Sequence, residues 1–229
     1  EDTKNYTVEQ LSLELQKLGS SINVSSGLTG ITFNVQALKK NLDAVLVLLT
    51  DRIYNPKFSE DVFNRIKKQR LESFKLAKSQ PAAVADVVFA KVNYGPNHIM
   101  GMSPNGTEET IGNITLQDIE NYYKNYMTAN DAKVIVVGDI KQADVLQKLS
   151  FLNKLPTKKV EMPKVDMAPN VDQTKVYMVD VPKGAQTEFR LGYSTGRKWD
   201  ATGEYYKSLL ANYTLGGGFN SRLNINLRE

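Results

Sequence analysis

The order of helical and strand-like patterns along the chain is the feature that most limits the folds it can adopt. Apolar residues at helical spacing predict helices over residues 7–18, 38–54, 59–77, 82–93 and 116–127. Between the first two helices, apolar and polar residues alternate in two short runs that predict a hairpin, around Ile22 and Val24 and around Ile31, Phe33 and Val35. Because helices and strands do not alternate one by one, the order favours an α+β fold, with helices packed on an antiparallel or mixed sheet, over a βαβ fold.

The composition changes after residue 158, which predicts a division into two domains. Residues 159–171 hold prolines, lysines and no lasting periodicity, as is typical of a linker. We expect residues 1–158 to form an α+β domain that lacks its N-terminal strands, and residues 172–229 to be the truncated, N-terminal part of a second, similar domain. Further strands are predicted over 133–137, 175–181 and 187–194, and further helices over 204–213 and 219–227.

The chain has no cysteine and a single histidine, His98. This composition excludes disulfides, thiolate metal sites, cysteine nucleophiles and any metal site that needs two histidines from this chain. His98 lies in a turn-rich loop, where a lone histidine is most often a hydrogen-bonding group. Paired acids such as Glu108 and Glu109 stand at predicted helix starts, where the helix dipole explains them without a catalytic role.

The charge pattern gives no sign of a nucleic-acid or membrane partner. The net charge of +4 comes from 29 basic and 25 acidic residues spread along the chain. The short basic clusters lie among acids or on helices, as is typical of solvated helix faces, so a nucleic-acid binder would rest on the pI alone. No apolar run reaches the roughly 18 residues that a membrane span needs. We therefore expect no nucleic-acid binding and no direct membrane insertion.

Three consecutive glycines, Gly216, Gly217 and Gly218, precede the last predicted helix. Backbone N–H groups at a helix N-terminus can hold an anion, but the Walker and dinucleotide-binding patterns are absent, and a helix rather than a strand comes before the glycines. Two interpretations stay open. The glycines form a helix-to-helix turn that needs positive φ angles, or they let another backbone approach closely.

Six segments, in order along nearly the whole chain, resemble the pitrilysin/insulinase family of zinc metallopeptidases, which includes the mitochondrial processing peptidase. They are VEQL running to LGSSI (8–22), NPKF (55–58), YGPNH (94–98), GTEETI (106–111), VVGDI (136–140), and LGGGFNSRL running into LRE (215–229). The resemblance implies a mitochondrial-processing-peptidase-like metallohydrolase fold. It also implies two similar halves that close around a substrate chamber, of which one carries zinc.

The chain departs from that family at the zinc ligands. The family's motif is H-x-x-E-H, followed by a glutamate from a later helix, and both histidines are missing here. The later helix carries two glutamates in the family, and Ile66 and Ser73 stand at the corresponding positions, with Glu72 one residue away. The resemblance therefore implies the non-catalytic half, with no catalytic residue and no cofactor in this segment, and zinc in a partner half.

The resemblance also implies a role for the end of the sequence. Arg228 matches an arginine that holds the substrate or its intermediate, together with a tyrosine a few residues beyond Glu229. A guanidinium offers five N–H donors in a fixed fork, which suits peptide carbonyls or a developing oxyanion. We expect Arg228 to bind substrate, together with Gly216, Gly217 and Gly218.

These expectations describe the non-catalytic half of a zinc-dependent metalloendopeptidase. It would form the substrate chamber and help to bind unfolded peptide, while a partner half, on the same polypeptide or in a separate subunit, carries H-x-x-E-H; this segment alone should hydrolyse nothing. The alternative is a catalytically dead scaffold in a multi-subunit complex. The resemblance further implies a periplasmic or cell-envelope location, because bacterial members of this type are often exported.

Overall fold

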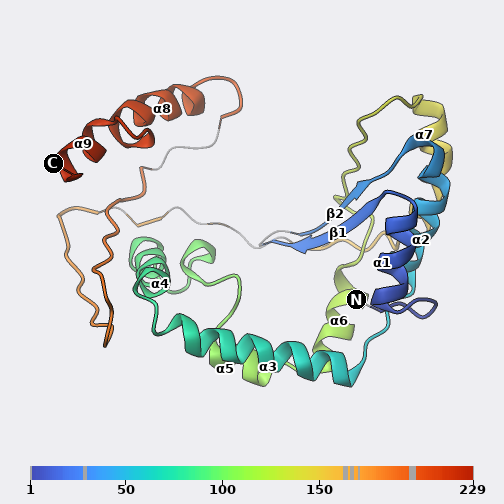
Figure 1. The fold of residues 1–229 in the computed structure, drawn as a ribbon, viewed down its shortest axis with the longest axis horizontal. Coiled ribbons are helices and arrows are strands. Elements are labelled where there is room, and N and C mark those ends of the chain that lie inside the picture. Colours follow the sequence, from blue (N-terminus) through green and yellow to red (C-terminus); the bar gives the residue numbers. More distant parts are fainter. Residues whose placement is uncertain are drawn as a thin grey trace.

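The chain folds into a helix-rich arrangement around one small hairpin, shown in Figure 1 by a computed structural model that describes residues 2–27, 30–161, 165, 168–169, 171–195 and 200–228. Half of the predicted linker, including Pro163, and Glu229 lie outside the described residues. The hairpin, α1, α2 and α7 gather at the right of the figure, and the C-terminal helices lie at the left. Helices with a small antiparallel sheet make an α+β protein, as predicted.

The predicted first helix and hairpin are confirmed. Helix α1 (Val8–Lys17) starts at Thr7, whose hydroxyl accepts from Gln10 N while the Gln10 side chain accepts from Thr7 N, a reciprocal cap. The helix ends before Gly19, which has a φ of 58° that favours glycine. Strands β1 (Ser21–Ser26) and β2 (Ile31–Gln36) then pair antiparallel, with Ser21 opposite Gln36.

The hydrophobic core lies between α1, the hairpin and α2 (Leu42–Tyr54), which follows the short 3₁₀ turn η1 (Lys39–Asn41). Its buried residues are apolar side chains at helical or alternating spacing: Leu11, Leu15, Ile22, Val45, Leu46, Leu48, Leu49 and Ile53. Side chains of the 3₁₀ turn η3 (Ser150–Lys154), which follows α7 (Gln142–Lys148), pack against this core from outside. Burial of each such leucine or isoleucine stabilises the fold by about 1.5–3 kcal/mol.

Helix α3 (Glu60–Ala77) leads away from this core toward α4 (Pro81–Tyr94), and none of its residues is buried (Figure 1). The short η2 (Ile99–Gly101) and α5 (Glu108–Asn113) follow α4, and α6 (Leu116–Tyr126) returns to the core. Lys67 Nζ on α3 donates to the carbonyls of Gly112 and Ile114 at 2.8 and 2.7 Å, which holds α5 against α3. The Tyr123 hydroxyl on α6 donates to the Ile53 carbonyl of α2.

The strands predicted over 133–137, 175–181 and 187–194 are wrong for this structure, because no strand is assigned to these residues. A strand exists only through hydrogen bonds to a neighbouring strand, and none of these segments has such a ladder in the described part of the chain. Their apolar side chains face solvent instead: Ile135 is 85%, Val137 93% and Leu191 99% exposed. The β-branched residues in these segments favour a strand, but the sequence pattern does not show whether a neighbouring strand is present.

The segment around residues 184–192 runs along α4 and joins the last part of the chain to the helical middle. Arg190 Nε lies 2.6 Å from Asp86 Oδ1 on α4. A Cβ built on Gly184 would lie 3.0 Å from Pro81 Cγ, and one built on Gly192 would lie 3.1 Å from Phe89 Cζ. The backbone of this segment therefore approaches α4 closely at both glycines.

The C-terminal helices are α8 (Glu204–Asn212), a π-helical turn η4 (Tyr213–Gly217) and α9 (Arg222–Arg228), which confirms the two helices predicted there. The whole chain exposes 18109 Å², whereas a compact protein of 25.6 kDa exposes about 10,400 Å². The arrangement is therefore open and leaves much apolar surface uncovered. Among the described residues, no helix has the length and apolar character needed to cross a bilayer.

Candidate functional site

The glycine run forms the end of the π-helical turn and the link to α9. A Cβ built on Gly217 would lie 3.2 Å from Tyr213 Cδ2, and one built on Gly218 would lie 3.2 Å from Tyr213 Cζ. A Cβ on Gly216 would lie 3.4 Å from Leu223 Cδ1. None of the three has a positive φ, so the glycines serve the close approach of the Tyr213 ring, and the turn that required positive φ angles is ruled out.

The link from the glycines to α9 is fixed by hydrogen bonds. Ser221 N donates to the Gly218 carbonyl at 3.0 Å, and Asn224 Nδ2 donates to the Phe219 carbonyl at 2.6 Å. Ser221 itself is only 3% exposed, and its hydroxyl finds no hydrogen-bond partner among the described residues. The backbone of Phe219 is therefore held from both sides, by the glycine turn and by the first turn of α9.

Arg228 ends α9, and its guanidinium lies over the Phe219 ring, with Cζ 4.8 Å from the ring centroid. Both side chains are exposed; Phe219 is 74% exposed. The structure therefore connects Arg228 to the glycine run through Phe219, which sequence reasoning did not single out. Nothing in the spacing signalled this contact, because the two residues lie nine positions apart across a turn.

The positions that carry glutamates in active zinc peptidases of the resembled family lie on α3. Ile66 is 40% exposed, and the Ser73 hydroxyl donates to the Arg70 carbonyl at 2.7 Å, within its own helix. Glu72 is exposed beside them. No group of three or more His, Cys, Asp or Glu side chains that could hold a metal ion occurs in the described part of the chain. The residues present do not fit a zinc ion.

His98 has the structural role that its loop position indicated. Its Nδ1 accepts from Met100 N at 3.0 Å and so caps η2. Its ring stacks on Tyr94, with centroids 5.3 Å apart. This arrangement positions the loop after α4.

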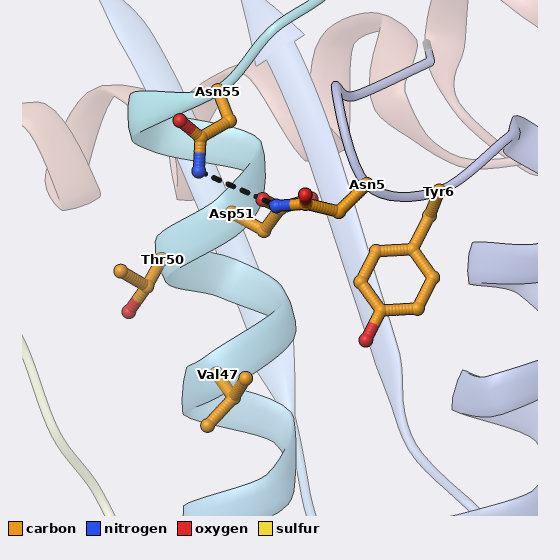
Figure 2. Close-up of a pocket in the computed structure, with 6 residues that line it drawn as sticks. All are labelled: Asn5, Tyr6, Val47, Thr50, Asp51 and Asn55. Atoms are coloured by element: carbon orange, nitrogen blue, oxygen red, sulfur yellow. Dashed lines mark hydrogen bonds between the residues drawn. The ribbon is translucent and has the colours of Figure 1, made fainter.

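A buried carboxylate, which the sequence analysis missed, lies near the C-terminal end of α2. Asp51 is 5% exposed, and Figure 2 shows two amides directed at it: Asn5 Nδ2 and Asn55 Nδ2 donate to its Oδ1 at 2.5 and 2.8 Å. Burial raises the pKa of Asp51, but the side chains of Thr3, Asn55 and Asn5 together hold it below its usual value. The one signal in the sequence was an acid inside an apolar helical stripe.

The surface beside Asp51 is hollowed, with a volume of about 310 Å³. Its lining, drawn in Figure 2, is mostly polar or aliphatic: Asn5, Tyr6, Val47, Thr50, Asp51 and Asn55. Asp51 Oδ2 accepts no hydrogen bond from the described residues and is itself buried, so a molecule in the hollow could not reach it. Asp51 thus ties the N-terminal segment to α2 and has a structural role.

Two family models match the chain, one over its first part and one over its second half. The model described as "Peptidase M16 inactive domain" matches residues 113–229, and the model described as "Insulinase (Peptidase family M16)" matches residues 1–96. These matches agree with the resemblance to the pitrilysin/insulinase family and with the non-catalytic half in particular.

Individual proteins agree with the family models. The chain is 24% identical to "Non-peptidase homolog YmxG" of Helicobacter pylori over 97% of its length and 51% of that protein. It is 20% identical to "Uncharacterized zinc protease YmxG" of Bacillus subtilis over 99% of its length and 54% of that protein. It therefore spans about half the length of these curated relatives. The crystal structure of a peptidase M16 inactive domain from Pseudomonas fluorescens shares the fold, with a TM-score of 0.67 at 20% identity over 74% of this chain and 41% of the other.

Proposed function

The chain belongs to the insulinase family of peptidases, family M16, as a non-catalytic half, and on that premise we propose that it forms one wall of a substrate chamber and binds unfolded peptide. A partner half that carries H-x-x-E-H, on the same polypeptide or in a separate subunit, supplies the zinc and the hydrolysis. A zinc ion held by that partner half would supply Lewis-acid chemistry and an activated water. This half contributes binding and orientation of the peptide.

The observation that carries the proposal is the loss of the metal ligands in a member of a zinc-dependent family. Ile66 has no donor atom, and the Ser73 hydroxyl is already bonded to the Arg70 carbonyl. The chain has one histidine and no cysteine, and its described residues include no group of three or more His, Cys, Asp or Glu side chains that could replace them. Its contribution to a peptidase is therefore to the substrate.

The substrate-binding side chain we propose is Arg228. It is an exposed cation on α9 with a planar fork of N–H donors. Its in-plane N–H groups can donate to a peptide carbonyl, and more strongly to an oxyanion that develops there during hydrolysis. Gly216, Gly217 and Gly218 let Tyr213 and the neighbouring backbone pack closely, which gives α9 a defined direction.

Exposed apolar side chains support a protein partner for this half. Leu191 and Val137 are more than nine-tenths exposed. Such side chains are stabilised when other protein covers them.

The test is hydrolysis of fluorescein-labelled β-casein by the H-x-x-E-H half, with and without the complete version of this half. We expect activity only when both are present, and Arg228→Ala should lower kcat/KM at least about tenfold. Arg222→Ala is the matched control, because Arg222 is an exposed arginine of the same helix and should change kcat/KM less than about twofold. Equal losses in the two variants would remove the assignment to Arg228.

A second candidate function is a scaffold without any part in proteolysis. The description of the Helicobacter pylori relative as a non-peptidase homolog favours it. A scaffold predicts either full hydrolysis without this half or none in any combination of the two halves. In that case Arg228→Ala leaves every measured rate unchanged.

We propose a periplasmic or cell-envelope location for this half. The absence of cysteine is compatible with an oxidising compartment, where a free thiol would be at risk. Fractionation of the source cells with periplasmic and cytoplasmic marker proteins tests the location. Recovery with the cytoplasmic marker would contradict it.

A further inference from the structure

We infer that Phe219 is a positioning residue for Arg228: its ring attracts the guanidinium and so limits the directions in which the N–H groups of Arg228 point. The inference rests on the proposed function, in which Arg228 binds substrate peptide. The observation is the contact itself, with Arg228 Cζ 4.8 Å from the centre of the Phe219 ring. This distance is within the range in which a cation is attracted to the face of an aromatic ring.

Arg228 needs such a contact because of its place in the fold. It lies on α9, and its long side chain is exposed. An arginine side chain has considerable rotamer freedom, which it would lose on binding a peptide. A ring that already orders the guanidinium lowers this entropic cost of binding.

Phe219 is suited to this task because its own backbone is fixed. Gly218, directly before it, packs under the Tyr213 ring, and the Gly218 carbonyl accepts from Ser221 N at 3.0 Å. The Phe219 carbonyl accepts from Asn224 Nδ2 at 2.6 Å. The ring is therefore attached to a defined turn, while its face remains available because the side chain is 74% exposed.

The contact leaves Arg228 able to bind an acceptor. A guanidinium has five N–H donors, and those that do not face the ring can donate to a peptide carbonyl or a carboxylate. A lysine in the same place would be attracted to the ring but has no planar fork of donors. The pair Phe219–Arg228 thus presents an oriented set of donors rather than a mobile positive charge.

The experiment measures binding of a fluorescein-labelled β-casein peptide to the complete protein by fluorescence anisotropy. We expect Phe219→Leu to weaken binding about 2- to 5-fold, the equivalent of about 0.5–1 kcal/mol at 1.4 kcal/mol per tenfold. Phe219→Tyr keeps the ring and should restore binding to within about twofold. In an Arg228→Ala background, Phe219→Leu should have no further effect, because the group that the ring positions is gone.

A second measurement reports on the contact without peptide. The Nε–H resonance of Arg228 in the complete protein should show the ring-current shift of the wild type in Phe219→Tyr and lose it in Phe219→Leu. Loss of peptide binding in Arg228→Ala, with unchanged binding in Phe219→Leu, overturns the inference and leaves the proposed function standing. Unchanged binding in Arg228→Ala overturns the substrate role of Arg228, and the inference with it, whatever the resonance shows.

Discussion

Replacing Asp51 by alanine tests the claim that a buried carboxylate ties the N-terminal segment to α2. The change removes the acceptor of two amide hydrogen bonds, from Asn5 at 2.5 Å and Asn55 at 2.8 Å. Hydrogen bonds to a charged group contribute about 1.5–3 kcal/mol each. The net contribution of Asp51 to stability is smaller than the sum of these two hydrogen bonds. Burial of the carboxylate with Oδ2 unpaired costs free energy, and the exposed Asn5 amide can bond to water once Asp51 is removed.

We therefore expect Asp51→Ala to lower the free energy of unfolding by about 2 kcal/mol, which lowers Tm by about 4–8 °C in a chain of this size. Urea unfolding followed by circular dichroism measures it. Asp43→Ala is the matched control, since Asp43 is an acid of the same helix whose side chain is 76% exposed in its ion pair with Lys148. That surface pair should be worth less than about 1 kcal/mol.

The same experiment has a pH dependence with a defined sign. The pKa of Asp51 in the folded chain lies below its ordinary value of 3.8. Its contribution to stability is therefore fully present above about pH 4 and is lost as the pH falls through 3.8 toward the lower folded-state value. The difference between wild type and Asp51→Ala should be constant near neutral pH and shrink in acid. A difference that stays the same down to pH 3, or an equal loss in Asp43→Ala, would refute the reasoning.

Three further outcomes follow from contacts described above. Gly217→Ala places a methyl group 3.2 Å from Tyr213 Cδ2 and should destabilise by about 1 kcal/mol. Gly112→Ala, in a helix with nothing within 4 Å of the added methyl group, should stabilise by about 0.5–1 kcal/mol. Thermal unfolding measures both, and a raised Tm in Gly217→Ala or a lowered Tm in Gly112→Ala would contradict the respective prediction. His98→Ala removes the cap on Met100 N and should cost about 1 kcal/mol in urea unfolding without changing β-casein hydrolysis by the assembled halves. Equilibrium dialysis should find no stoichiometric zinc on this half when it is purified free of its partner, and bound zinc would overturn the reading of Ile66 and Ser73.

Local patterns predicted the helices and the hairpin because the cause of each lies within a few residues. Leu11 and Leu15 mark the buried face of α1, and Thr7 caps it. Helix α5 was expected only as a helix start at Glu108 and Glu109, because its six residues carry no apolar stripe, and α7 was not predicted. Thr107 and Thr110 form a reciprocal cap at the start of α5. A helix as short as α5 depends on a tertiary contact, here the hydrogen bond from Lys67, rather than on its own periodicity.

The rest could not be predicted because it depends on partners distant in sequence. The β-branched run over residues 133–137 becomes a strand only beside another strand, and sequence cannot supply that neighbour. The role of Arg228 in the candidate site comes from the resemblance and stays a prediction. Its contact with Phe219 depends on the turn that Tyr213 and the glycines build. The Asp51 site depends in the same way on the N-terminal segment returning to α2.

Helix α3 separates the hydrophobic core from α4 and has no buried residue along its 18 positions. At 1.5 Å per residue it is about 27 Å long, and this length sets the distance between the hydrophobic core and α4. A substitution on its surface leaves that spacing unchanged, whereas deletion of one residue shortens it by about 1.5 Å and rotates everything beyond by about 100°. The number of residues in α3 therefore constrains the arrangement more than the identity of its exposed side chains does, apart from Lys67, which holds α5.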